Sequence, residues 1–138
     1  MRMTPFAVSD NDIPKDLFEQ FKQIRSFIEW LPDFEGELLT CHALCGALAQ
    51  LHPTLQRIDG YFGGFFSHSW LIDYRYPKVI MDMYPVGGGV PYIVYADSSL
   101  LPWKKLYTVK KASYDQEACR RQIEKILEHA REQGVRSM

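Results

Sequence analysis

Three side chains suited to acyl transfer follow one another along the sequence. Cys41 begins an apolar run after Thr40, His68 lies in a stretch rich in aromatic residues, and Asp82 precedes Met83-Tyr84-Pro85. A thiol can attack a carbonyl carbon, an imidazole can accept the thiol proton, and a carboxylate can orient the imidazole. The order and types of these residues predict a cysteine-dependent enzyme with a Cys41–His68–Asp82 triad.

Cys41 has the local sequence expected of an activated thiol. Thr40 is a good helix N-cap, and capping there makes Cys41 the first residue of a helix. Unpaired amides and the positive end of the helix dipole stabilise a thiolate at this position, and the same amides can hold an oxyanion. Cys45, one turn further along the same face, is the fallback nucleophile, although a small cysteine on an apolar face is commonly a core residue. We expect Cys119, in the last helix, to be structural.

His68 and Asp82 are predicted to meet across a β-hairpin. If the two strand-like runs that contain them pair about a turn centred on Arg75, the two residues lie directly opposite each other on one face. Asp82 can then accept a hydrogen bond from one ring nitrogen, which leaves the other nitrogen for the thiol. A slip of one residue would place Asp82 on the wrong face. Asp59 and Asp73 are the substitutes, and Asp73 is expected to be solvated near the turn.

Length, composition and charge describe an ordinary globular domain. The chain has 138 residues, of which 46% are hydrophobic and 24% are charged, so we expect a single domain over 1–138. A net charge of -1 predicts no nucleic-acid surface, and no apolar run approaches the roughly 20 residues of a membrane span. Three cysteines, two of them four residues apart, imply no disulfide framework and favour a cytoplasmic protein with reduced thiols.

The hydrophobic pattern changes from helical to strand-like and back. Apolar residues three and four apart predict a first helix over 14–31 with Asp12 as its N-cap, after a poorly ordered lead-in over 1–12. Ser113 and Gln116 are placed for a capping box before the last helix. We therefore predict an α+β fold in which N-terminal helices pack on an antiparallel meander of about five strands, with a C-terminal helix. The second helix is expected over 41–50, and the strands over 55–61, 68–73, 79–84, 91–95 and 106–110.

The same residues resemble a family pattern. The similarity is to the transglutaminase-like branch of the papain-like cysteine enzymes, and it covers about residues 36–86. It implies a papain-like/transglutaminase-like core. The matching segments are Cys41-x-x-x-Cys45, Ile58-Asp59-Gly60-Tyr61, His68-Ser69-Trp70 and Ile80-Met81-Asp82-Met83-Tyr84-Pro85.

The resemblance implies a role for each matched residue. Cys41 matches the nucleophile, Cys45 the small residue one turn later, His68 the base and Asp82 its orienting partner. The chain departs from the pattern at Glu35, which stands where papain has a glutamine for the oxyanion hole, and in the short stretch before the histidine. Proteases, deamidases, transglutaminases and N-acyltransferases belong to this superfamily, together with members that have lost catalysis.

The expected reaction is hydrolysis of an amide bond by a cysteine hydrolase or acyltransferase. A protease, a peptidase or a deamidase fits this reaction, with a peptide or protein, including a glutamine side chain, as the substrate. We expect Trp70 to shield the triad from water and Tyr61 to line the cleft. The predicted chemistry uses no cofactor and no metal, and we expect neither nucleic acid nor membrane as a partner.

Two other classes of function are alternatives. Cys41, His42, Cys45 and His68 include the thiolate and imidazole ligands that zinc accepts, which defines a metal-binding protein. A non-catalytic binding domain on the same fold would use aromatic side chains to line a groove. The aromatic residues expected to be exposed are Tyr74, Tyr76, Tyr84, Tyr92, Tyr95 and Trp103.

Overall fold

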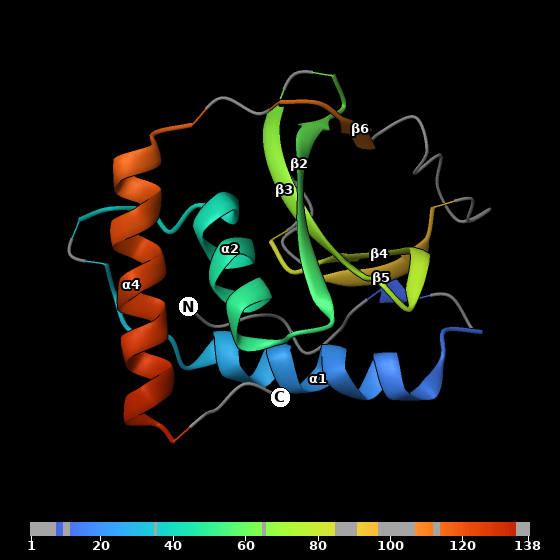
Figure 1. The fold of residues 1–138 in the computed structure, drawn as a ribbon, viewed down its shortest axis with the longest axis horizontal. Helices are drawn as coiled ribbons and strands as arrows, with labels where there is room; N and C mark the ends of the chain where they lie inside the picture. Colours follow the sequence, from blue (N-terminus) through green and yellow to red (C-terminus); the bar gives the residue numbers. More distant parts are fainter. Residues whose placement is uncertain are drawn as a thin grey trace.

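The protein has an α+β fold in which helices pack against one face of a six-stranded sheet (Figure 1). The computed structural model describes residues 8–9, 12–34, 36–64, 66–84, 91–96, 107–111 and 114–134. Its helices are α1 (Lys15–Glu29), α2 (Cys41–Leu51) and α4 (Gln116–Glu132). Its strands are β1 (Val8–Ser9), β2 (Leu55–Phe62), β3 (Phe66–Asp73), β4 (Tyr76–Asp82), β5 (Tyr92–Tyr95) and β6 (Tyr107–Val109). The predicted α+β class is confirmed.

Helix α1 forms where apolar residues recur every three or four positions. It begins directly after Pro14, whose ψ of 136° is extended, so the helix cannot start earlier and the predicted N-cap Asp12 is wrong. The periodic apolar residues face the core, as the pattern predicts. The buried residues of α1 are Leu17, Phe21, Ile24 and Ile28.

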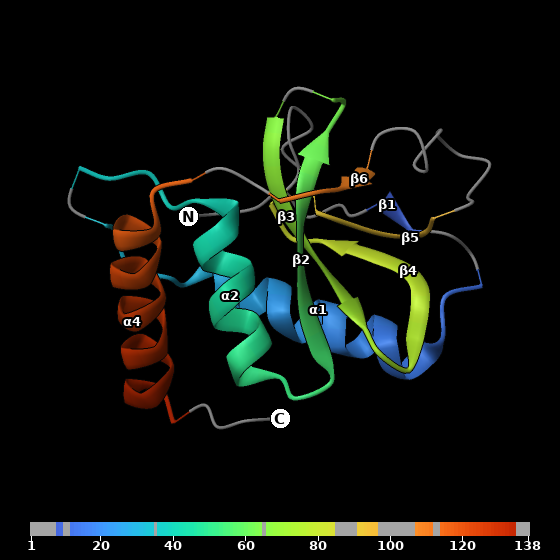
Figure 2. The same cartoon turned by 45° about the horizontal axis from the view of Figure 1, so that its top comes forward.

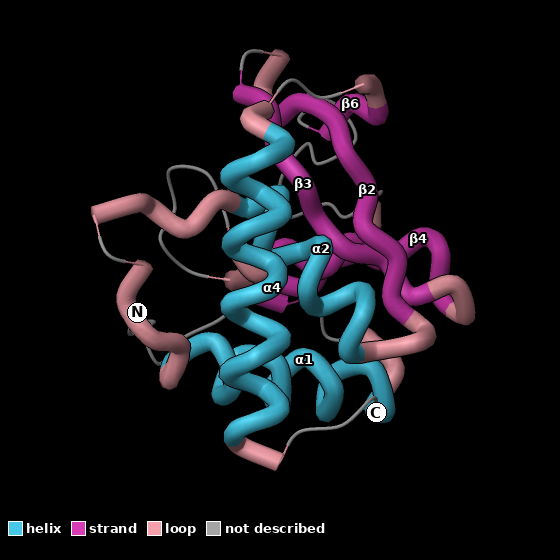
Figure 3. The backbone as a smooth tube through the Cα atoms, turned by 60° about the vertical axis from the view of Figure 1, so that its left-hand side comes forward, coloured by secondary structure: helices cyan, strands magenta, loops and turns pink. Residues whose placement is uncertain are grey.

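Helix α2 is the central helix. Thr40 caps it by accepting a hydrogen bond of 3.1 Å from the Ala43 amide, so Cys41 is its first residue, as predicted. The Thr40 amide in turn donates to Gln122 Oε1 at 3.1 Å, which fixes the start of α2 against α4. Figure 3 shows α4 lying across α2, while the other side of α2 faces β2 and β3. A helix covered on both sides is buried around most of its circumference.

Helix α4 closes the structure with an amphipathic stripe. Asp115 is its N-cap and accepts a hydrogen bond of 3.0 Å from the Ala118 amide. The predicted cap was Ser113, which lies outside the described residues. Asp115 is the better cap because it directly precedes the helix and can accept from its third amide.

The sheet is not a simple meander. Its strand order is β1-β5-β4-β3-β2-β6, and β2 to β5 pair antiparallel in sequence order (Figure 2). Strand β6 crosses over to pair with β2, where a meander would have placed it beside β5. Strand β1 pairs parallel with β5, so the segment 1–12, predicted to be a lead-in, contains one regular element.

The β3–β4 hairpin has a tighter turn than predicted. Its turn is residues 74–75, and the pairs formed are Asp73 with Tyr76 and Leu71 with Met81. One residue lies between these pairs on β3 and four lie between them on β4, so β4 contains a bulge. The bulge bends β4 away from the upper part of β3 (Figure 2).

This bulge changes the predicted position of Asp82 relative to His68. Asp82 follows Met81, which pairs with Leu71, so the register places Asp82 opposite Trp70 and not opposite His68. The difference is two residues, and side chains alternate faces along a strand, so Asp82 stays on the face of His68. The two residues are diagonal neighbours.

Two hydrophobic clusters occupy the two faces of the sheet. The larger cluster lies between the sheet and the helices, and it includes Phe21, Ile24, Leu48, Leu71 and Met81. The smaller cluster lies on the other face and contains Trp70, Ile80, Tyr92, Val94 and Tyr107. Across the described residues, every helix is too short or too polar to cross a membrane.

Candidate functional site

His68 and Asp82 form a buried hydrogen-bonded pair. Nε2 of His68 lies 2.8 Å from Oδ2 of Asp82, and both residues are 0% exposed. The pair belongs to the face of the smaller cluster, because Asp82 is paired across the sheet with Tyr92. The structure thus brings together the two residues that the sequence predicted as base and orienting carboxylate.

Asp82 accepts further hydrogen bonds that fix its carboxylate. The hydroxyl of Tyr107 donates to Oδ2 at 2.6 Å, and the Tyr84 amide donates to Oδ1 at 3.1 Å. The Tyr107 hydroxyl is also hydrogen-bonded to that of Tyr92. Sequence reasoning missed Tyr107, because it reaches Asp82 only through the crossover of β6 to β2.

The surroundings of His68 favour its protonated form. Burial lowers the pKa of His68, but its hydrogen bond with Asp82 and its interaction with the Cys41 thiol outweigh burial and raise the pKa to about 9. The rings of Phe62, Trp70 and Tyr107 surround the imidazole with centroid distances of 6.0, 6.1 and 6.2 Å. Their π-electrons attract a cation.

The second ring nitrogen of His68 differs from the first in its surroundings. Nδ1 is buried and has no aligned hydrogen-bond partner among the described residues. The electrostatic interaction of His68 with Cys41 contributes to the raised pKa of the imidazole.

The three cysteines differ in their access to solvent. Cys41 is half-buried at the first position of α2, whereas Cys45 and Cys119 are buried. Burial raises the pKa of the Cys45 thiol well above its ordinary value and also raises the pKa of Cys119. Neither buried thiol is suited to nucleophilic attack at neutral pH.

Trp70 and Tyr61 have different relations to the triad. Trp70 is 3% exposed and its ring is stacked near the His68 ring, in a position to exclude water. Tyr61 pairs with Ser67 across β2 and β3, so its side chain points to the opposite face from His68. Tyr61 therefore lies on the face of the sheet that carries Ser67, and its predicted role in lining a cleft stays a prediction.

The two substitute aspartates have other partners. Asp73 was expected to be solvated, but it is 1% exposed and pairs with Arg75 at 2.8 Å. Asp59 accepts a hydrogen bond of 2.6 Å from the Ser69 hydroxyl and pairs with Arg57 at 3.2 Å. Glu35, considered for the oxyanion position, lies outside the described residues.

Gly60 leaves room for strand β6 and for the Trp70 ring to pack closely beside it. It pairs with His68 on β3 and with Val109 on β6. A Cβ at this position would lie 2.0 Å from the Thr108 carbonyl oxygen and 2.8 Å from the Trp70 ring. Only glycine therefore lets β6 pack here, and β6 carries the tyrosine that binds Asp82.

A second polar network lies on the helix side of β3, and sequence reasoning missed it. His42 Nδ1 is 2.6 Å from Ser69 Oγ, and Ser67 Oγ is 3.1 Å from His42 Nε2. The zinc alternative had grouped His42 with the triad residues. Within the described ranges, no three His, Cys, Asp or Glu side chains come together to hold a metal ion.

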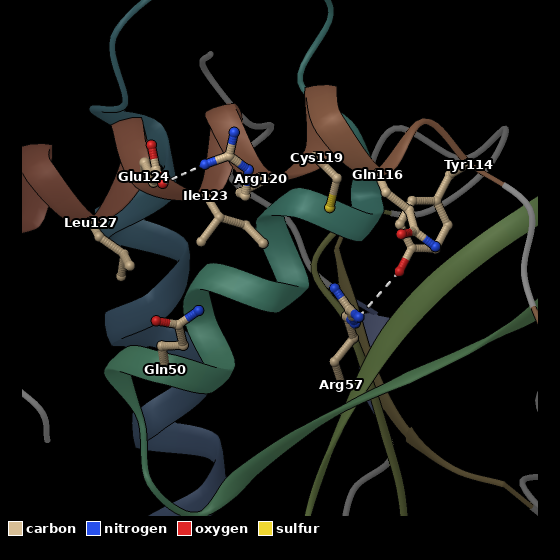
Figure 4. A pocket seen from close by; sticks show the side chains of 9 residues that line it. All are labelled: Gln50, Arg57, Tyr114, Gln116, Cys119, Arg120, Ile123, Glu124 and Leu127. Atoms are coloured by element: carbon tan, nitrogen blue, oxygen red, sulfur yellow. Dashed lines mark hydrogen bonds and ion pairs between the residues drawn. The ribbon is translucent and has the colours of Figure 1, made fainter.

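A pocket lies between α2 and α4, apart from Cys41, His68 and Asp82. It is a groove of about 380 Å³ between α2 and α4, with Arg57 at its base and Tyr114 and Cys119 on its walls (Figure 4). The guanidinium of Arg57 donates to the Tyr114 hydroxyl at 3.2 Å. Cys41, His68 and Asp82 are not among the residues that line it.

No known protein family, curated protein or solved structure matches this chain. The chemistry of the site must therefore be argued from its own residues.

Proposed function

We propose that the protein is a cysteine-dependent acyl-transfer enzyme of the papain-like/transglutaminase-like kind, with Cys41 as nucleophile, His68 as base and Asp82 as the residue that orients His68. The observation that carries the proposal is the buried pair of His68 and Asp82, joined through Nε2 at 2.8 Å. This hydrogen bond occupies Nε2, so Nδ1 is the nitrogen that we assign to the half-buried Cys41, whose interaction with His68 contributes to the raised pKa of the imidazole. A base that is oriented on one side and open on the other is what a thiol nucleophile requires.

In the proposed resting state the thiol proton of Cys41 has already passed to Nδ1 of His68, so the reaction starts from a thiolate–imidazolium pair. The thiolate sulfur then forms a bond to the carbonyl carbon of the substrate amide, and the carbonyl oxygen becomes an oxyanion. When the carbon–nitrogen bond breaks, His68 returns its proton to the leaving amine. Water, deprotonated by His68, then cleaves the thioester and regenerates the thiol.

The start of α2 is suited to hold the oxyanion. The Ala43 amide donates its hydrogen bond to the Thr40 side chain. The amides before Ala43 in the first turn have no acceptor within the helix, so they are available to an oxyanion formed at Cys41. The positive end of the helix dipole adds to their effect. Stabilisation of an oxyanion is commonly the largest single contribution to acyl-transfer rates.

A peptide or protein amide is the substrate class that we propose, with hydrolysis as the reaction. A protease, a peptidase and a deamidase share this chemistry and differ only in which amide enters the site. Aromatic side chains around His68 exclude water from one side of the triad, which strengthens the electrostatic interactions of the pair.

A non-catalytic binding domain is the second candidate. The observation that favours it is the complete burial of His68 and Asp82, because a buried and satisfied ion pair can be purely structural. Exposed aromatic side chains such as Tyr74 and Phe66, 65% and 57% exposed, would then serve for binding. Reactivity of Cys41 separates the two candidates.

The test is iodoacetamide labelling of each cysteine as a function of pH, resolved by mass spectrometry. We expect rapid labelling of Cys41 at about pH 6, lost in His68→Ala, because an imidazolium keeps the thiolate ionised below the ordinary range. Cys45 and Cys119 should remain slow because they are buried. The control is His52→Gln, which changes another buried histidine, at the end of α2 away from Cys41.

Slow labelling of all three cysteines, rising only at alkaline pH and insensitive to His68→Ala, would support the binding domain and contradict the enzyme. Rapid labelling of Cys45 in place of Cys41 would move the nucleophile by one helical turn.

A further inference from the structure

The residues next to the proposed nucleophile and base are joined by a chain of hydrogen bonds. His42 directly follows Cys41 on α2, while Ser67 and Ser69 flank His68 on β3. His42 Nδ1 lies 2.6 Å from the Ser69 hydroxyl oxygen, and Ser67 Oγ lies 3.1 Å from His42 Nε2. The His42 imidazole therefore contacts both residues that flank His68 on β3.

The direction of each hydrogen bond follows from its partners. The Ser69 hydroxyl has a single proton and donates it to Asp59 Oδ1 at 2.6 Å. In the contact between Ser69 and His42, the imidazole Nδ1–H must then be the donor, so Nε2 accepts from the Ser67 hydroxyl. Burial lowers the pKa of His42, which keeps its ring neutral at pH 7.

Four further contacts hold these hydrogen-bonded residues in place. Tyr114 stacks on the His42 ring with a centroid distance of 4.1 Å and an interplanar angle of 17°. Arg57 pairs with Asp59 at 3.2 Å and donates to the His42 carbonyl oxygen at 3.4 Å and to the Tyr114 hydroxyl. A partly buried network whose hydrogen bonds support one another is restricted to one geometry.

We propose that His42 is a positioning residue that sets the distance between Cys41 and His68 by tying the start of α2 to β3. The inference rests on the proposed function, since it concerns the spacing of its nucleophile and base. His42 touches neither the thiol nor the substrate in this role. It acts because Cys41 and His42 share one helical turn, and because β3 presents Ser67, His68 and Ser69 from consecutive positions.

The distance between Cys41 and His68 should affect reactivity more than the stability that the His42 hydrogen bonds contribute. A displacement of about 1 Å between reacting groups can lower a rate by about a hundredfold. Without the hydrogen bonds to β3, the polar contacts at the start of α2 are those of Thr40 with Gln122 on α4 and of the His42 carbonyl with Arg57 on β2, and these contacts do not involve His68.

The test measures the labelling rate of Cys41 by iodoacetamide at about pH 6 and about pH 10 in variants of the full chain. At the alkaline pH every exposed thiol is ionised, so the rate reports access alone, whereas the acidic rate depends on His68. We expect His42→Ala and Ser69→Ala to lower the rate at about pH 6 by about tenfold. The rate at about pH 10 should stay within about twofold of the wild-type rate.

Matched variants separate positioning from general destabilisation. His42→Asn can donate from the place of Nδ1 to Ser69, so it should recover part of the acidic rate. Ser67→Ala should have a smaller effect than Ser69→Ala, because its contact with His42 is longer. Ile24→Val, which trims the core under α1, is the control for lower stability and should leave the ratio of the two rates unchanged.

The possible failures are distinguishable. Wild-type labelling that is fast at about pH 6, lost in His68→Ala and unchanged in His42→Ala and Ser69→Ala overturns the positioning role alone. Absence of the fast reaction in the wild-type protein overturns both proposals. If the His42 variants do not fold, nitrogen-15 NMR of the wild-type imidazoles decides: a neutral His42 protonated at Nδ1 supports the chain, and a ring protonated at Nε2 overturns it.

Discussion

The charge of His68 depends on one carboxylate. Asp82 has 0% exposure and accepts hydrogen bonds from Tyr107, the Tyr84 amide and His68, so its carboxyl group is held in one orientation. The His68 ring is in turn raised to a pKa of about 9 against the effect of its burial. Removal of this single charge should change the protonation of His68 more than any other substitution nearby.

Asp82→Asn tests this dependence at the residue scale. The amide keeps the size of the side chain and removes its charge, so we expect the pKa of His68 to fall by about one unit or more. The labelling rate of Cys41 at about pH 6 should fall without reaching the level of His68→Ala, because the base remains but its orientation is poorer. An NMR titration of the His68 ring measures the first effect.

The control for this substitution is Asp73→Asn. Asp73 is also a buried aspartate of the β3–β4 hairpin, but its partner is Arg75. Its replacement should leave the titration of His68 unchanged. An unchanged titration in Asp82→Asn as well would remove Asp82 from the triad.

At the scale of the element, the cap of α2 links stability to reactivity. Thr40→Ala removes the hydrogen bond to the Ala43 amide and should lower the free energy of unfolding by about 1 kcal/mol. Asp115→Ala removes the equivalent bond at the start of α4 and should cost a similar amount. Of these two helices, only α2 begins with Cys41. Only Thr40→Ala should therefore slow the labelling of Cys41 at about pH 6.

Urea unfolding and cysteine-resolved labelling of both variants check this expectation, and Thr40→Ser should restore the wild-type values. Equal loss of Cys41 labelling in the two cap variants would show that α2 is disturbed only through global stability.

Local sequence signals predicted helix α2 well, but they predicted the pairing of distant strands less well. The cap of α2 depends on Thr40 and a few following residues, all visible in the sequence. The β3–β4 register depends on a bulge in β4, which no turn residue announces. Asp82 still meets His68, because the register error was an even number of residues and kept it on the same face.

At the scale of the whole molecule, the crossover of β6 decides what surrounds the triad. A meander would have left β2 as an edge strand and would have placed β6 beside β5. Instead Gly60 admits β6 beside β2, and Tyr107 completes the hydrogen bonds of the carboxylate. Strand order is a property of the assembled chain, and hydrophobic periodicity does not contain it. The contact of His68 with Asp82 and the helix start at Cys41 were therefore predictable from the sequence, and the contacts of Tyr107 and His42 were not.

The buried histidines should give the molecule a maximum of stability near about pH 6.5, the ordinary pKa of histidine. His68 has a raised pKa of about 9, so above pH 6.5 the native state keeps a proton that the unfolded state has lost. The free energy of unfolding should therefore fall as pH rises from about 6.5, by up to about 3 kcal/mol if the shift acts in full. Burial lowers the pKa of His42 and of His52, so below about pH 6.5 the unfolded state binds protons first and stability falls again.

Urea unfolding measured from about pH 5 to about pH 8 tests both arms of this profile, in a range below the titration of the buried thiols and tyrosines. His68→Gln should remove the decline between about pH 6.5 and 8 and keep the acidic decline, because it deletes only the group with the raised pKa. His52→Gln should weaken the acidic arm and leave the alkaline arm unchanged, because its pKa is lowered by burial. A wild-type profile that rises or stays level from about pH 6.5 to 8 would mean that His68 is neutral in the native protein, and the triad would then lack the imidazolium that its carboxylate and aromatic neighbours are arranged to stabilise.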